Sequence, residues 1–157
     1  MKIESLKFKT EKEYKEFLDY LFSIRDIEYR DFNTKIIVPV DCEIIGIRTP
    51  ILRDIAKKIA KTSSENFLNF FEKLFLKKKI KYYEEKVLYG FLIGYSKLDY
   101  QDRLRRIDFF INIIDNWAVC DIVDSSFKFI NKNKEDFYKY LNSKLSATNP
   151  WEQRFIF

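Results

Sequence analysis

A tryptophan and an aspartate stand four residues apart in the segment IIDNWAVCD, which ends at Asp121. An α-helix advances about 100° per residue, so Trp117 and Asp121 lie within about 40° of each other on its surface. The opposite side of the same helix carries the apolar residues Val119, Ile122, Val123 and Ile130. This pattern predicts a helix whose polar face presents an aromatic ring and a carboxylate together.

Such a pair has a structural explanation as well as a functional one. Trp117 on a polar face either packs on a neighbouring element or offers its ring to a ligand. Asp121, near a helix start, also complements the helix dipole. A second pair, Trp151 and Arg154, shares a face of the helix that Pro150 opens. If alternate helices of a stack line one surface, the two pairs converge on one groove.

The residue types restrict the chemistry that this groove can perform. The chain of 157 residues contains no histidine, which rules out Ser-His-Asp and Cys-His mechanisms. Its two cysteines, Cys42 and Cys120, cannot complete a tetrahedral zinc shell, and we expect them to be free thiols. Catalysis must therefore use carboxylates, arginine, lysine, tyrosine or aromatic faces, and no cofactor is expected.

The charge balance favours an anionic partner without establishing one. Lys and Arg number 29 against 24 Asp and Glu, a net charge of +5. The basic candidates for contacts to an anion are Arg48, Arg53 and Lys57, and further cations lie in KKKIK (77–81) and RLRR (103–106). Charge runs of this kind are commonly solvated faces or loops, and they can also be phosphate contacts; both interpretations remain open.

Helices must position all of these residues, because the chain has only 3 Gly and 3 Pro. Helix start signals from Pro50 onward recur about every 16 to 18 residues. This pitch predicts an all-α fold: a HEAT-like repeat solenoid of antiparallel helix pairs, curved with a basic concave face. A plain helical bundle is the alternative. We expect one domain over residues 1–157, truncated at its C-terminal end because the chain stops within an apolar helix pattern.

Several of these helices have recognisable ends and faces. Thr10 and Glu13 predict a capping box, and a short helix followed by an extended connector is expected within residues 28–45. Glu84 and Glu85 are expected to be first-turn acids of a helix that begins at Tyr82. Ser64 is expected to precede one further helix and Asp99 to precede another, with later helix starts near 115, 133 and 150. The helix expected over 50–61 has a buried face made by Leu52, Ile55, Ala56 and Ile59.

The stretches IIGIRTPILRDIAKKIAK, YYEEKVLYGFLI, INIIDNWAVCD and WEQRF, in this order, resemble the bacterial DNA alkylation repair proteins of the AlkD type. That family consists of HEAT-like DNA glycosylases. The resemblance covers residues 25–157, and its specific part is the NWAxCD element with the arginine downstream. It implies excision of cationic N3- and N7-alkylated purines from duplex DNA, with the DNA backbone held in a basic concave groove.

The resemblance also assigns roles to the paired residues. Asp121 matches the carboxylate that stabilises the oxocarbenium-like transition state and orients the attacking water. Trp117 matches the aromatic residue that packs against the sugar of the damaged nucleotide. Arg154 matches the arginine that contacts the DNA backbone near the lesion. Trp151 joins Arg48, Arg53 and Lys57 as a candidate DNA contact.

Two other functions remain open from the residues. One is a non-catalytic HEAT-like module that binds the DNA backbone by shape and charge; the other is a protein-interaction solenoid. The expected partner is duplex DNA containing alkylated bases, bound by a monomer. No apolar run reaches the length of a membrane span, and a cytoplasmic, nucleoid-associated protein is expected.

Overall fold

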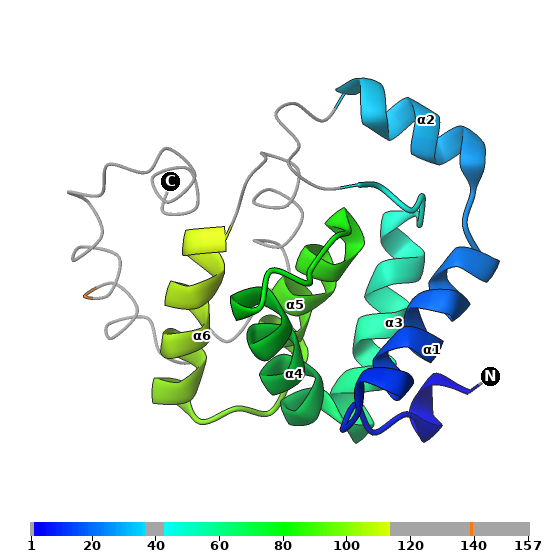
Figure 1. The fold of residues 1–157 in the computed structure, drawn as a ribbon. Helices are drawn as coiled ribbons and strands as arrows, with labels where there is room; N and C mark the ends of the chain where they lie inside the picture. Colours follow the sequence, from blue (N-terminus) through cyan, green and yellow to red (C-terminus); the bar gives the residue numbers. More distant parts are fainter. Residues whose placement is uncertain (1, 37–42, 114–138, 140–157) are drawn as a thin grey trace.

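A computed structural model describes residues 2–36, 43–113 and 139 of the chain. These residues form one short 3-10 helix, η1 (Ile3–Ser5), and six α-helices, with no β-strand among them (Figure 1). The expectation of an all-α fold is confirmed for this part of the chain. The α-helices are α1 (Glu11–Ser23), α2 (Ile27–Ile36), α3 (Thr49–Thr62), α4 (Ser64–Leu76), α5 (Tyr83–Tyr95) and α6 (Tyr100–Ile113).

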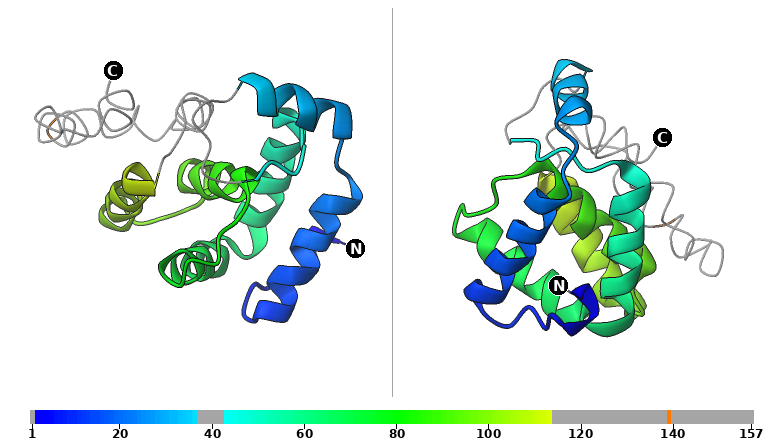
Figure 2. Two further views of the ribbon diagram at one scale, coloured as in Figure 1. Left: turned by 45° about the horizontal axis from the view of Figure 1, so that its top comes forward. Right: turned by 90° about the vertical axis from the view of Figure 1, so that its right-hand side faces the viewer.

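Helix α5 occupies the centre of the described structure. It packs against α3, α4 and α6, and it lies between α3 and α6 in two of the views (Figures 1 and 2). Eleven of its residues, from Tyr83 to Ile93, are buried. A helix that is apolar around most of its circumference is expected to be surrounded by protein. Residues at the ends of α5 can therefore reach the helices on either side.

Helix α3 is amphipathic, and its buried side is the predicted one. Pro50 stands in its first turn, where the missing N–H costs nothing. The apolar stripe faces α5, and the contact between α3 and α5 is the most extensive among the described helices. Because this stripe is buried, the basic residues of α3 remain on its other sides. The buried stripe consists of Leu52, Ile55, Ala56 and Ile59.

The start of α1 follows half of the predicted capping box. The Thr10 hydroxyl accepts the backbone N–H of Glu13 at 3.2 Å, as expected. The Glu13 carboxylate does not return to Thr10; it accepts the backbone N–H groups of Lys7 (2.9 Å) and Lys9 (3.4 Å). Glu13 therefore ties the preceding segment to α1.

The segment before α3 is fastened to the start of α5. The backbone N–H of Glu43 donates to the Lys81 carbonyl, and the Glu43 carbonyl accepts the N–H of Tyr83. The Glu84 carboxylate then accepts three successive backbone N–H groups, at 2.9, 2.9 and 3.3 Å. These three donors belong to Ile45, Gly46 and Ile47. The position of the α3 N-terminus thus depends on one side chain of α5.

Gly46 is required at the centre of this fastened segment. Its φ of +107° lies in a region that L side chains rarely adopt. A Cβ there would stand 2.6 Å from the Asp26 carbonyl oxygen and 2.7 Å from the Arg30 Cβ. The Gly46 carbonyl also accepts the N–H of Asp26 at 2.8 Å. This close approach fixes the start of α2 against the segment that leads into α3.

Most of the predicted helix starts are confirmed within a residue. Helix α2 is the short helix expected before the connector, and α6 begins directly after Asp99. Helix α5 begins one residue after Tyr82, which is its N-cap. Helix α4 begins at Ser64 rather than after it, with Ser63 as N-cap residue. The starts expected near 115, 133 and 150 lie outside the described residues, as do Cys42 and Cys120.

Candidate nucleic-acid interface

The predicted site residues divide into two groups. Trp117, Asp121, Trp151 and Arg154 lie outside the described residues, so their geometry stays a prediction. The basic candidates Arg48, Arg53 and Lys57 are all described, and all three belong to α3 or its N-cap. Their surroundings give the structural part of the site.

Aromatic residues of α5 hold Arg53 in place. Its Nη1 donates to the Tyr95 hydroxyl at 3.0 Å, and its guanidinium carbon lies 4.9 Å from the centroid of the Phe91 ring. Both contacts orient the planar guanidinium, which restricts its motion before any ligand binds. An arginine held in this way is suited to bidentate recognition of a phosphate.

Lys57 lies one helical turn after Arg53 and shares the same aromatic support. Its ammonium is 5.5 Å from the centroid of the Tyr95 ring, and its side chain is exposed. Tyr95 therefore contacts one cation with its hydroxyl and the next with its ring. We call Arg53, Lys57, Phe91 and Tyr95 the α3–α5 ledge.

Arg48 has a different environment from the ledge. Its Nη2 pairs with the Asp26 carboxylate at 3.1 Å, and its guanidinium carbon lies 5.0 Å from the Tyr29 ring centroid. The backbone N–H of Tyr29 and then the Arg48 side chain lower the pKa of Asp26. A phosphate at Arg48 would therefore compete with an ionised carboxylate.

The arginines of RLRR form a structural network. Arg106 is 2% exposed and pairs with Glu72 at 2.9 Å and with Asp102 at 3.0 Å. Arg105 pairs with the same two carboxylates, at 3.1 and 3.2 Å. Arg103 donates to the Ser96 carbonyl. The cluster lies within α6 and joins it to α4; Arg106 is buried in it, while the Arg105 side chain is 55% exposed.

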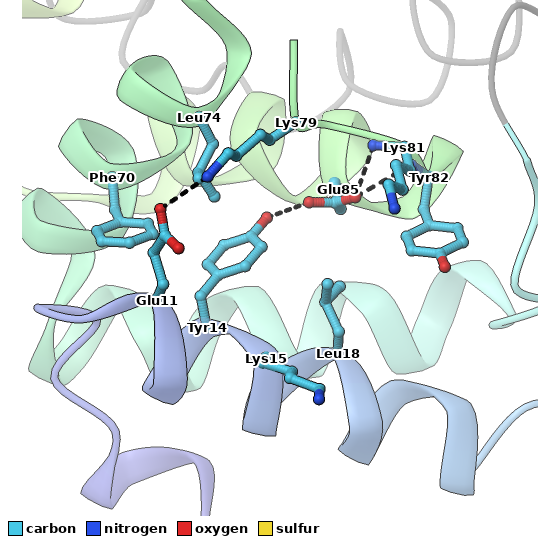
Figure 3. A pocket seen from close by; sticks show the side chains of 10 residues that line it. All are labelled: Glu11, Tyr14, Lys15, Leu18, Phe70, Leu74, Lys79, Lys81, Tyr82 and Glu85. Carbon is cyan, nitrogen blue, oxygen red and sulfur yellow. Dashed lines mark hydrogen bonds and ion pairs between the residues drawn. The ribbon is translucent and has the colours of Figure 1, made fainter. Parts of the chain in front are cut away.

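The lysines of KKKIK lie in the connection between α4 and α5. Lys79 pairs with Glu11 at 3.1 Å, which links this connection to α1. Beside that pair a cavity of about 340 Å³ lies between α1 and the α4–α5 connection, and Lys15 and Lys81 are among the residues that line it (Figure 3).

Glu84 and Glu85 have more specific roles than first-turn acids. Both are buried, and Glu85 accepts the Tyr14 hydroxyl of α1 and the backbone N–H groups of Lys81 and Tyr82 (Figure 3). Burial raises the pKa of Glu84 and Glu85, although their hydrogen-bond donors act in the opposite direction. The sequence signal for this burial is the position of the two acids in YYEEKVLYGFLIGY, where Lys86 is the one other charged residue and the rest is apolar, aromatic or glycine.

No group of His, Cys, Asp and Glu residues that could hold a metal occurs within the described ranges. None of the described helices has the length and apolar character needed to cross a bilayer.

Fold and site together define the class of protein. The described part is an all-helical structure in which α3 carries cations supported by aromatic rings of α5, an arrangement suited to a polyanion. The chain matches the family model described as DNA alkylation repair enzyme over residues 8–156, and it belongs to that family. The predicted resemblance is thereby confirmed. No match was found among curated proteins or among solved structures.

Proposed function

We propose that this member of the DNA alkylation repair family is a DNA glycosylase. It hydrolyses the N-glycosidic bond of N3- and N7-alkylated purines in duplex DNA. The observation that carries the proposal is the family match, which includes the segment with Trp117 and Asp121 and extends past Arg154. Membership of the family supports repair of alkylated DNA by an enzyme. The side chains that the chain contains restrict which reaction mechanisms are possible.

The reaction suits the side chains that this chain contains. A purine alkylated at N3 or N7 carries a positive charge and leaves readily, so no general acid is needed, and the chain has no histidine to serve as one. Departure of the base leaves positive charge on the deoxyribose. The Asp121 carboxylate stabilises that charge and orients the water, and the Trp117 ring faces the sugar.

The described residues supply the binding part of the proposal. Arg53 and Lys57 on the α3–α5 ledge contact phosphates of the duplex, and Arg48 and Trp151 are further candidate DNA contacts. If helices alternate as in a HEAT-like solenoid, α3 and the helix predicted around Asp121 belong to one basic concave face. Arg154 contacts the backbone close to the lesion.

The direct test is release of 7-methylguanine and 3-methyladenine from methylated duplex DNA. We expect release by the wild-type protein, and loss of at least about 100-fold in the Asp121→Asn variant. Asp19→Asn, which changes an exposed carboxylate of α1, is the matched control and should retain wild-type rates. Equal rates for all three proteins would refute the role of Asp121.

The second candidate is a non-catalytic module that binds the DNA backbone. The aromatic support of Arg53 and Lys57 favours it equally, because that support serves binding rather than bond cleavage. Binding of undamaged duplex that weakens steeply with salt, with no base released from methylated DNA, would establish this function and exclude the glycosylase.

A further inference from the structure

A second basic cavity adjoins the α3–α5 ledge, where α3 and α5 end. It has a volume of about 380 Å³ and is lined by Lys57, Ala60, Lys61, Tyr95 and Lys97. Lys57 and Lys61 are four residues apart on α3, so they lie on one face of the helix. Lys97 follows the C-terminus of α5. Segments 36 residues apart in sequence thus bring three ammonium groups to one cavity.

The charged side chains that line this cavity are all positive. None of its five lining residues is acidic, and Lys61 and Lys97 are exposed. Within the described part of the chain, no ion pair is formed by Lys57, Lys61 or Lys97. By contrast, the next lysine of α3, Lys58, pairs with Asp54 at 3.1 Å. Like charges held close together raise the local potential for an anion.

The cavity also has an apolar wall. The Tyr95 ring and Ala60 provide it, and the ring already attracts the Lys57 ammonium at 5.5 Å. Cations beside a small apolar surface match a phosphodiester with its attached sugar better than they match a carboxylate alone. The cavity is continuous with the ledge because Lys57 and Tyr95 belong to both.

We propose that Lys57, Lys61 and Lys97 form a subsite around Tyr95 that holds one backbone phosphate of the DNA duplex. The inference rests on the proposed function, which makes duplex DNA the ligand, and it extends the contact surface from Arg53 to the ends of α3 and α5. Lys61 and Lys97 donate to the phosphate oxygens. Tyr95 is a positioning residue, since it holds Lys57 and Arg53 in place.

Salt-dependent binding of a fluorescent undamaged duplex tests the subsite without requiring base release. Fluorescence anisotropy between 50 and 200 mM salt would compare the wild type with Lys61→Gln and Lys97→Gln. Because the lysines share one phosphate, the double variant Lys61→Gln/Lys97→Gln should reduce the slope of log affinity against log salt in magnitude by up to about 0.9, and each single variant should reduce it by less. Lys77→Gln carries the same charge change at the other end of the helices, after α4, and should leave the slope unchanged.

Each outcome has one meaning for the subsite. Unchanged slopes in both variants, or equal changes in Lys77→Gln, would overturn it while leaving the glycosylase proposal standing if methylated DNA is processed. Reduced slopes without any base release would support the subsite and refute the glycosylase. Absence of duplex binding by the wild type would overturn the subsite.

Competition with inorganic phosphate distinguishes a DNA backbone phosphate from free phosphate as the ligand of the cavity. Inorganic phosphate should displace the duplex only at millimolar concentration, because a single phosphate loses the contacts of the ledge. Displacement at micromolar concentration, lost in Lys61→Gln, would show that the cavity binds free phosphate and would overturn its assignment to DNA.

Discussion

At the scale of single residues, Glu84 does more to position the candidate site than any basic residue. Its carboxylate accepts the N–H groups of Ile45, Gly46 and Ile47, and so places the segment that ends at Arg48. Helix rules predicted Glu84 only as an acid of the first turn, because they consider neighbours along the chain. The donors are 37 to 39 residues away, and no local pattern identifies them.

Replacing Glu84 by Gln should destabilise the protein. The amide keeps one acceptor oxygen but turns an N–H₂ group toward backbone donors, which leaves buried N–H groups unsatisfied. We expect the free energy of unfolding to fall by about 1 to 3 kcal/mol in urea denaturation. Glu65→Gln, an exposed first-turn acid of α4, is the control and should change it by less than about 0.5 kcal/mol.

Glu13 provides a prediction about pH. The hydrogen bond from the Lys7 N–H lowers the pKa of Glu13 below its usual 4.5. A depressed folded-state pKa means that its stabilisation is present above about pH 4.5 and is lost as the pH falls through the folded value. Thermal melts should show a higher midpoint for the wild type than for Glu13→Gln at pH 6, and the two midpoints should converge as the pH falls below the folded-state pKa of Glu13. A gap that does not depend on pH would contradict this.

At the scale of elements, the cluster RLRR shows what a basic run can hide. Asp102 with Arg105 and Arg106 was recognisable from the helix spacings of three and four residues. Glu72 was not, because it belongs to α4 and its approach depends on how α4 and α6 both pack on α5. The cluster consequently joins helices, and the guanidinium groups of Arg105 and Arg106 are both paired with carboxylates.

The Glu72→Gln variant should therefore weaken the fold. It leaves the buried Arg106 guanidinium with Asp102 as its remaining carboxylate among the described residues, and it alters the acceptor of the Tyr89 hydroxyl. Breaking a buried pair costs about 3 to 5 kcal/mol, and Glu72 is 13% exposed, so the upper part of that range is not expected. Chemical denaturation measures the loss. Lys73→Gln, an exposed neighbour, should be close to neutral, and an equal loss there would contradict the assignment.

At the scale of the whole molecule, features set by neighbouring residues could be predicted from the sequence, whereas contacts between distant helices could not. The all-α class, the buried stripe of α3 and the helix starts followed from periodicity and capping, which act within a few residues. Helical spacing and resemblance also predict Trp117 and Asp121 as residues of the candidate reaction centre; they lie outside the described residues and stay a prediction, whereas the family is confirmed. The support that Phe91 and Tyr95 give to Arg53 required the packing of α3 on α5, which composition does not encode.

The Tyr95→Phe variant tests this joint between two helices. It removes the hydroxyl that accepts from Arg53 and keeps the ring that contacts Lys57, so every charge remains. We expect duplex affinity to fall by about 2- to 10-fold with an unchanged salt slope, since the hydrogen bond that orients the Arg53 guanidinium is lost while its charge remains. Anisotropy titrations beside Tyr20→Phe, on α1, provide the measurement and its control. A changed slope would show that Tyr95 affects the number of phosphates bound.

The junction of residues 43–47 with the start of α5 also has a consequence for amide hydrogen exchange. The amide protons of Glu43, Ile45, Gly46 and Ile47 are held by a carbonyl or carboxylate of residues 81–84. They can exchange with solvent only when this segment separates from α5. Because α5 is enclosed by three other helices, that separation opens the core. These four amides of an irregular segment should therefore exchange as slowly as those of the central helix.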